Sequence, residues 1–196
     1  MSNLELNKGD NFIFGIDVSG SMSTPDCPGN LTRIEYLKEK TIAFAIEAGK
    51  YDSDGIDVLT FGHQVRSHLG VTAEKAKDIV GKLQANEGAT MTHLLIDEAY
   101  ALHKHGGYEQ TVLFIATDGA PSDPDAVKTA IRRIAAELDD EHEFAISFLT
   151  VGVIDHSLRA FLDMLDDNLG AKHDIVDVKA LDQVDFVTAF VGALHD

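Results

Sequence analysis

Residues 11–22 read NFIFGIDVSGSM, an apolar run that ends in an aspartate and two serines at alternate positions. Segment 12–16 is short, β-branched and aromatic, which is typical of a strand buried on both faces in a parallel sheet. Asp17, Ser19 and Ser21 follow it within one turn. Carboxylate and hydroxyl oxygens suit hard cations such as Mg²⁺, so this turn is a candidate metal site. The alternative is a polar loop whose serines cap the next helix.

Two later segments favour the metal site. Residues 88–92 read GATMT ahead of an apolar-periodic stretch, so Thr90 offers a hydroxyl from a loop above the sheet. Residues 111–123 read TVLFIATDGAPSD, a second buried strand that ends in Thr117 and Asp118. Because parallel strands end at a shared edge of an open sheet, where ligands bind, we expect Asp17 and Asp118 to be neighbours.

At these motifs the chain resembles the von Willebrand factor type A family, also called the integrin I-domain fold. The likeness covers nearly the whole chain and is closest in kind to stand-alone bacterial or phage domains. The family's metal-ion-dependent adhesion site joins a DxSxS turn, a threonine in a GGT-like loop and an aspartate in a TDG-like loop. The residues that match this site here are Asp17, Ser19, Ser21, Thr90 and Asp118.

The threonine loop departs from the family pattern at one position. Its second glycine is Ala89 here, which leaves Thr92 as the alternative threonine ligand. Family precedent implies that the serines and one of the two later residues bind the ion directly, while other residues act through water. The sequence leaves open which of Thr90 and Asp118 is the direct ligand.

The rest of the chain alternates predicted strands with predicted helices. Strands are expected at residues 12–16, 56–61, 65–69, 111–116, 144–151 and 175–178. Helices are expected at 32–49, 73–83, 92–104, 125–138, 158–166 and 181–194. Residues 62–63 predict a hairpin. The pattern indicates a doubly wound, Rossmann-like α/β fold: a mostly parallel six-stranded sheet with one antiparallel edge strand and helices on both faces.

Composition limits the organisation and the partners. With 196 residues, 44% of them hydrophobic, and no Pro/Gly/Ser-rich linker, the chain is predicted to form a single domain over residues 1–196. The formal charge of −17 argues against nucleic acid or an anionic membrane as partner. No apolar signal core or membrane-spanning run is evident, so we expect a cytoplasmic protein.

The nine histidines do not form a zinc motif. Neither the i, i+4 spacing of a zinc-binding helix nor a cysteine cluster accompanies them, and Cys27 is the single cysteine. Most are predicted to lie on the surface. His93 follows the threonine loop and is expected near the rim of the site.

The resemblance implies a metal-dependent interaction module rather than an enzyme. A Mg²⁺ ion, with Mn²⁺ or Ca²⁺ as alternatives, keeps a position open for a Glu or Asp supplied by a partner protein. Family context suggests an ATPase or a stress-complex component as that partner, and a coupled movement of the last helix, residues 181–194.

Two rival functions remain. A Mg²⁺-dependent phosphatase of the haloacid-dehalogenase type needs DxDxT, whereas the second acid position here is Ser19, which cannot serve as a general acid. The other rival is an ion that only stabilises the loops, while partners bind elsewhere.

Overall fold

The fold is built around β1 (Asp10–Asp17), a strand whose residues are almost all buried. The computed structural model describes residues 10–50 and 54–183. Within that range the sheet has six strands in the order β3-β2-β1-β4-β5-β6. The other five are β2 (Ile56–Phe61), β3 (Val65–Val71), β4 (Gln110–Thr117), β5 (Phe144–Thr150) and β6 (Val176–Ala180). β2 and β3 pair antiparallel, and the remaining neighbours are parallel. The predicted fold class is confirmed.

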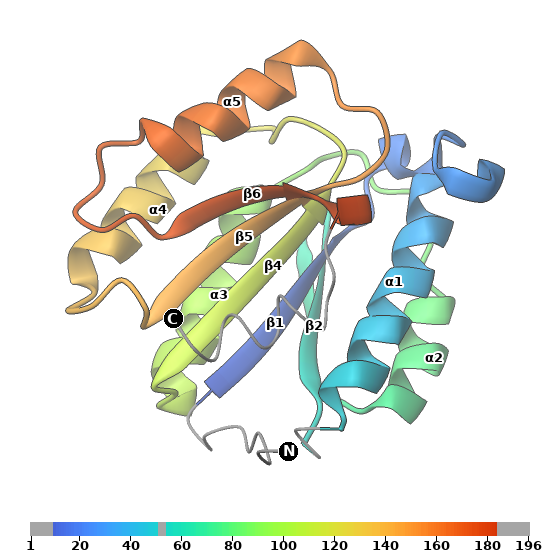
Figure 1. The fold of residues 1–196 in the computed structure, drawn as a ribbon, viewed down its shortest axis with the longest axis horizontal. Helices are drawn as coiled ribbons and strands as arrows, with labels where there is room; N and C mark the ends of the chain where they lie inside the picture. Colours follow the sequence, from blue (N-terminus) through green and yellow to red (C-terminus); the bar gives the residue numbers. More distant parts are fainter. Residues whose placement is uncertain (1–9, 51–53, 184–196) are drawn as a thin grey trace.

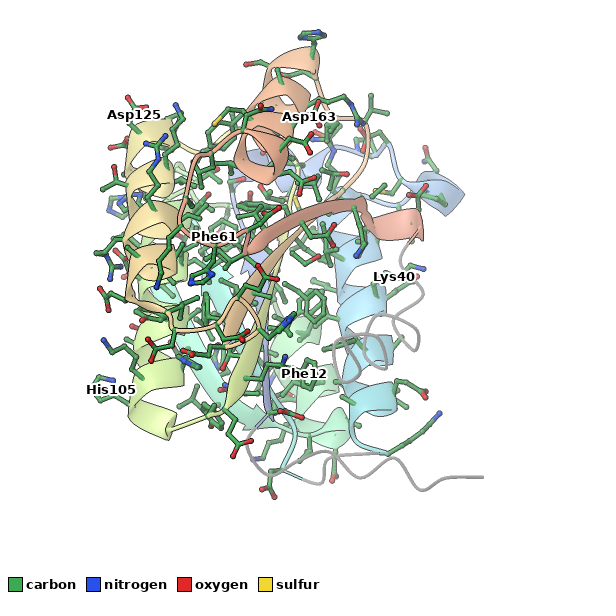
Figure 2. The ribbon with its side chains drawn as sticks, turned by 60° about the vertical axis from the view of Figure 1, so that its left-hand side comes forward. Phe12, Lys40, Phe61, His105, Asp125 and Asp163 are labelled. Carbon is green, nitrogen blue, oxygen red and sulfur yellow. The ribbon has the colours of Figure 1, made fainter. Side chains whose placement is uncertain are left out.

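Helices cover both faces of this sheet, as Figure 1 shows. On one side lie α1 (Arg33–Ala48) and α2 (Ala73–Gly81). On the other lie α3 (Thr92–Gly106), α4 (Pro124–Glu137) and α5 (His156–Asp167). Figure 2 shows Phe12 on the α1 side of the sheet and Phe61 on the side of α3 and α4.

Alternation along β1 divides the interior into two cores. Phe14 and Ile16 pack in the core that α1 and α2 cover, whereas Ile13 packs in the core of α3, α4 and α5. The ring of Phe14 lies 5.5 Å from that of Phe44 in α1. At Gly15 an added Cβ would stand 2.6 Å from Cδ2 of Leu95, because α3 packs directly on the strand. Successive strand residues face opposite layers, which is why the run is apolar throughout.

The caps explain where the predicted helices begin. Thr32 and Glu35 form a reciprocal capping box at the start of α1. At the start of α4, the Asp123 side chain accepts from the Ala126 N–H. Most element ends differ from the predicted ones by one or two residues, since helix ends fray and strand ends depend on pairing.

The last predicted helix, residues 181–194, lies largely outside the described residues. The structure describes a short 3₁₀ turn, η3 (Leu181–Gln183), at its start. Two further 3₁₀ turns, η1 (Gly20–Ser23) and η2 (Pro28–Asn30), separate β1 from α1. They lie at the carboxyl edge of the sheet, at the upper right of Figure 1.

Among residues 10–50 and 54–183, none of the helices combines the length and apolar character needed to cross a bilayer.

Candidate functional site

The register of the central strands brings the two predicted aspartates together. Ile16 of β1 pairs with Ala116 of β4, so both strands reach the carboxyl edge at the same level. The Thr117 hydroxyl donates to Oδ2 of Asp17 over 2.6 Å. The two strand ends, 100 positions apart in sequence, are therefore joined by a buried hydrogen bond.

Asp17 is a fully buried carboxylate, with 0% of the residue exposed. Its other oxygen, Oδ1, accepts from the backbone N–H of Ser19 over 2.8 Å. Burial raises its pKa to about 6 against the lowering effect of these hydrogen bonds, and the charge of Asp118 adds to the rise. Neither contact is with a cation, so the negative charge of Asp17 is left uncompensated by them.

The two serines connect Asp17 to Asp118. Ser19 Oγ and Ser21 Oγ lie 3.1 Å apart, and Ser21 Oγ donates to Oδ1 of Asp118 over 2.8 Å. The η1 turn produces this approach, and the N–H of Gly20 anchors it by donating to the carbonyl of Glu87. Four of the five predicted ligands thus form one chain of contacts.

The backbone of Thr90 is hydrogen-bonded to the loop that follows Asp118. Its N–H donates to Oγ of Ser122, and the N–H of Ser122 donates to its carbonyl, both over 3.0 Å. Among the hydrogen bonds of the described residues, none joins the Thr90 hydroxyl to the other four predicted ligands. The alternative, Thr92, is buried at the first position of α3.

Sequence reasoning missed Arg33. Its Nη1 atom donates to Oδ2 of Asp118 over 2.6 Å, with the Arg33 side chain 11% exposed and the Asp118 side chain 0%. The guanidinium also binds Asp26, and these carboxylates raise its pKa further above the usual range. The sequence contains one indication that Arg33 is buried. It lies four residues before Leu37, on the stripe of α1 that faces the core.

Among the described histidines, His103 is the buried one. Its Nδ1 lies 3.0 Å from Oγ1 of Thr111, and its ring is stacked on Tyr100. It packs as a core residue, because α3 turns this face toward β4. His93 is half-buried, and its buried Nδ1 atom lacks a hydrogen-bond partner.

The donor chemistry of the site fits a hard divalent ion. The described residues contain no cluster of three or more His, Cys, Asp or Glu side chains suited to a metal. An ion at this edge would therefore depend on hydroxyls as well as on Asp17 and Asp118. Such an all-oxygen set suits Mg²⁺ or Mn²⁺, and a cation there would compensate the buried charge of Asp17.

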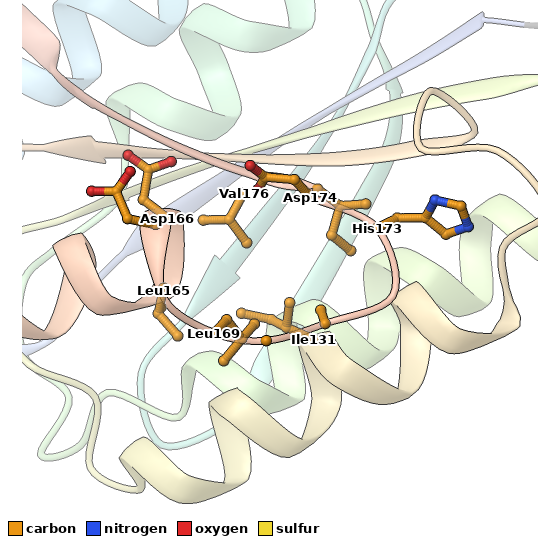
Figure 3. Close-up of a pocket in the computed structure, with 11 residues that line it drawn as sticks. Ile131, Leu165, Asp166, Leu169, His173, Asp174 and Val176 are labelled. Atoms are coloured by element: carbon orange, nitrogen blue, oxygen red, sulfur yellow. The ribbon is translucent and has the colours of Figure 1, made fainter.

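A pocket of about 220 Å³ lies elsewhere, between α4, α5 and the loop after α5. Figure 3 shows Asp166 at one end and His173 at the other, with Ile131 and Leu169 along the apolar floor. Burial, and then the charges of nearby aspartates, raise the pKa of Asp166. This pocket includes none of the predicted metal ligands.

The chain belongs to the von Willebrand factor type A domain family. A model of that family matches residues 12–121, which include all five predicted ligands. A comparison with curated proteins gave no significant match.

Solved structures share the fold at low sequence identity. The D319A mutant of the PilB minor pilin from Streptococcus sanguinis has a TM-score of 0.68 at 11% identity, over 97% of this chain and 62% of that one. Manganese-loaded TRAP protein from Plasmodium vivax has a TM-score of 0.59 at 13% identity, over 91% and 72%. A von Willebrand factor type A protein from Catenulispora acidiphila has a TM-score of 0.60 at 18% identity, over 94% and 41%.

Proposed function

We propose that this protein is a divalent-metal-dependent protein–protein interaction module. The ion would be held by Asp17, Ser19, Ser21, Thr90 and Asp118, and a partner protein would supply a Glu or Asp as a further ligand. One observation carries the proposal: two carboxylates and two hydroxyls meet at the carboxyl edge of the sheet, and both carboxylates, Asp17 and Asp118, are buried.

The chemistry of that group explains why an ion would bind a carboxylate from outside. Asp17 and Asp118 together match the charge of a divalent ion, and the hydroxyls add neutral ligands. Ser21 lies at the exposed side of the group, which would leave an ion accessible from solvent. A carboxylate from a partner would then replace a water on the ion and bind the ion directly.

The family relationship supports the proposed kind of function. One structural relative, TRAP, is described as manganese-loaded, and another is a minor pilin. The net charge of −17 favours a partner whose acidic residue lies in a basic or neutral surface. Cytoplasmic location, and an ATPase or stress-complex component as partner, remain predictions.

The phosphatase alternative is disfavoured by the position of Asp17. A nucleophilic aspartate must present an oxygen to the phosphoryl group. Both Asp17 oxygens instead accept internal hydrogen bonds, and the residue is 0% exposed. Ser19, at the position of the general acid, contacts Ser21.

A matched pair of small ligands tests the function. With Mn²⁺ bound, water-proton relaxation reports the waters on the ion. We expect N-acetylglutamate methylamide to lower this relaxation saturably, and N-acetylglutamine methylamide to leave it unchanged, since only the carboxylate displaces water. The Asp17→Ala variant should show no protein-bound Mn²⁺ signal.

Two outcomes would contradict the proposal. Equal responses to the glutamate and glutamine ligands would show that the ion does not select a carboxylate. If Mn²⁺ binds but neither ligand changes the water-proton relaxation, the result would support the alternative in which the ion only stabilises the loops.

A further inference from the structure

Both oxygens of Asp118 are engaged, one of them with a permanent cation. Ser21 donates to Oδ1 over 2.8 Å, and Nη1 of Arg33 donates to Oδ2 over 2.6 Å. Guanidinium groups stay protonated in proteins, so this charge is fixed. Arg33 is therefore in direct contact with a predicted metal ligand.

The rest of the guanidinium is anchored away from the site. Its Nε and Nη2 atoms donate to the two oxygens of Asp26 over 2.8 and 2.6 Å. Nη2 also donates to the carbonyl of Val153 over 2.9 Å. A Cβ on Gly152 would stand 2.6 Å from Nε, so the loop between β5 and α5 packs against this pair. These contacts fix the orientation of the guanidinium, which cannot turn away from Asp118 without losing them.

A divalent ion would have to share Asp118 with this guanidinium. The two cations repel each other, and the low exposure of both side chains limits screening by water and salt. In the metal-free protein the same guanidinium compensates the buried charge of Asp118.

We propose that Arg33 is a built-in counter-cation of the metal site, which holds Asp118 in the metal-free protein and lowers the affinity of the site for divalent ions. This inference rests on the proposed function, because it takes Asp118 as a metal ligand. It adds a residue outside the predicted ligand set that determines how readily the ion binds.

Calorimetric titration with Mn²⁺ in 0.15 M NaCl tests the proposal. We expect Arg33→Gln to bind Mn²⁺ about tenfold more tightly than the wild type, because a repelling charge has been removed. Without metal the same variant should melt at a lower temperature, because Asp118 loses its buried partner. A residue with only a structural role would weaken both the fold and ion binding. That result, or an unchanged affinity, would overturn the proposal.

Two control variants separate this local effect from a general change in charge. Lys40→Gln removes one positive charge from the same helix, about 10 Å further along its axis. The Lys40 ammonium lies 5.2 Å from the centre of the Tyr36 ring and the residue is partly exposed, so water and salt screen its charge. The Mn²⁺ affinity of this variant should stay within about twofold of wild type. Arg33→Lys keeps the charge but loses the fork, and it should bind Mn²⁺ no more tightly than the wild type. A tenfold gain in either control would overturn the proposal.

The titration distinguishes this inference from the proposed function. If the wild type binds Mn²⁺ and Arg33→Gln binds it no more tightly, only the role of Arg33 fails. If neither protein binds Mn²⁺ saturably, both fail. Should Arg33→Gln be unfolded in EDTA, its affinity is read from Mn²⁺-dependent refolding. The double variant Asp17→Ala/Arg33→Gln is then the control, and no refolding of Arg33→Gln by Mn²⁺ counts against the proposal.

Discussion

At the scale of single residues, Asp17 opposes folding when no cation accompanies it. Its pKa rises from 3.8 to about 6, first through burial. The folded protein therefore binds more protons than the unfolded chain between these values, and the contribution of Asp17 to stability falls as pH rises from about 4 to about 6. Below about pH 4 the carboxyl is protonated in both states and this cost disappears.

We predict that Asp17→Asn stabilises the metal-free protein at pH 7.5 while abolishing metal binding. The gain should be about 1–3 kcal/mol, because the buried charge is removed but an amide accepts hydrogen bonds at only one of its two ends. Urea unfolding in EDTA measures the gain. The fall in stability between pH 4 and 6 should also be smaller in this variant.

Asp118→Asn is the matched control for Asp17→Asn. Asp118 is ion-paired with Arg33, so neutralising it should destabilise the metal-free protein by about 2–4 kcal/mol. Stabilisation by Asp118→Asn, or destabilisation by Asp17→Asn, would contradict this account of the two charges.

The sequence allowed prediction of the residues that lie at or just after the strand ends, but not of the helix residue that contacts them. Asp17 and Asp118 each end a recognisable apolar run, and parallel pairing places them at one edge. The contact of Arg33 with Asp118 spans 85 positions, and it involves a charge buried by the packing of a helix against a loop. No local pattern encodes such packing, although the position of Arg33 on the buried stripe of α1 was visible.

At the scale of elements, the loop between β5 and α5 depends on a glycine. Gly152 has φ +69°, and a Cβ there would lie 2.5 Å from Oδ1 of Asp26 and 2.6 Å from Nε of Arg33. The backbone conformation and the close approach both exclude a side chain.

We predict that Gly152→Ala lowers the unfolding free energy by about 2–3 kcal/mol, through backbone strain and displacement of the Arg33–Asp26 pair. Gly107→Ala is the control, because Gly107 has φ +65° and nothing within 4 Å of its added Cβ. It should cost only about 1 kcal/mol of strain. Thermal and urea unfolding measure both variants, and equal losses would mean that the contact with the ion pair is unimportant.

The packing of α3 on β4 gives the protein an acid-sensitive element. Burial lowers the pKa of His103 below 6.5, against the opposing charge of Glu143. The unfolded chain therefore takes up a proton that the folded chain excludes, and stability falls as pH drops below about 6.5. We predict that the stability advantage of wild type over His103→Gln shrinks between pH 7.5 and pH 5 in urea unfolding.

His105→Gln, on the exposed side of the same helix, is the control for His103→Gln. The difference in unfolding free energy between His105→Gln and wild type should change less between pH 7.5 and pH 5 than that of His103→Gln. A pH dependence as large as that of His103→Gln would assign the effect to surface histidines.

Element positions were more predictable than element ends. The apolar periods located the described strands and helices, because each element must bury one face or stripe. The end of α2 at Gly81 and the start of β6 at Val176 were displaced from the predicted positions by tertiary packing and strand pairing. The burial of His103 was missed for a similar reason, since the helical period alone does not say how far α3 wraps over β4.

At the scale of the whole molecule, the order of the strands in the sheet brings the residues of the site together. β1 lies between β2 and β4, and the ends of β1 and β4 supply Asp17 and Asp118. The predicted alternation of strands and helices therefore led to the arrangement of the site as well as to the fold. Thr90 lies in the loop before α3, so the pairing of the strands does not determine where its hydroxyl lies.

Binding of one divalent ion at this edge of the sheet is the property that the proposed function requires first. Calorimetric titration of the wild type with Mg²⁺ and Mn²⁺, beside Asp17→Ala, tests that claim directly. We predict one saturable ion per chain in the wild type and none in Asp17→Ala, with both proteins folded by circular dichroism. Absence of saturable binding in the wild type, or equal binding by the folded variant, would contradict the proposed metal site.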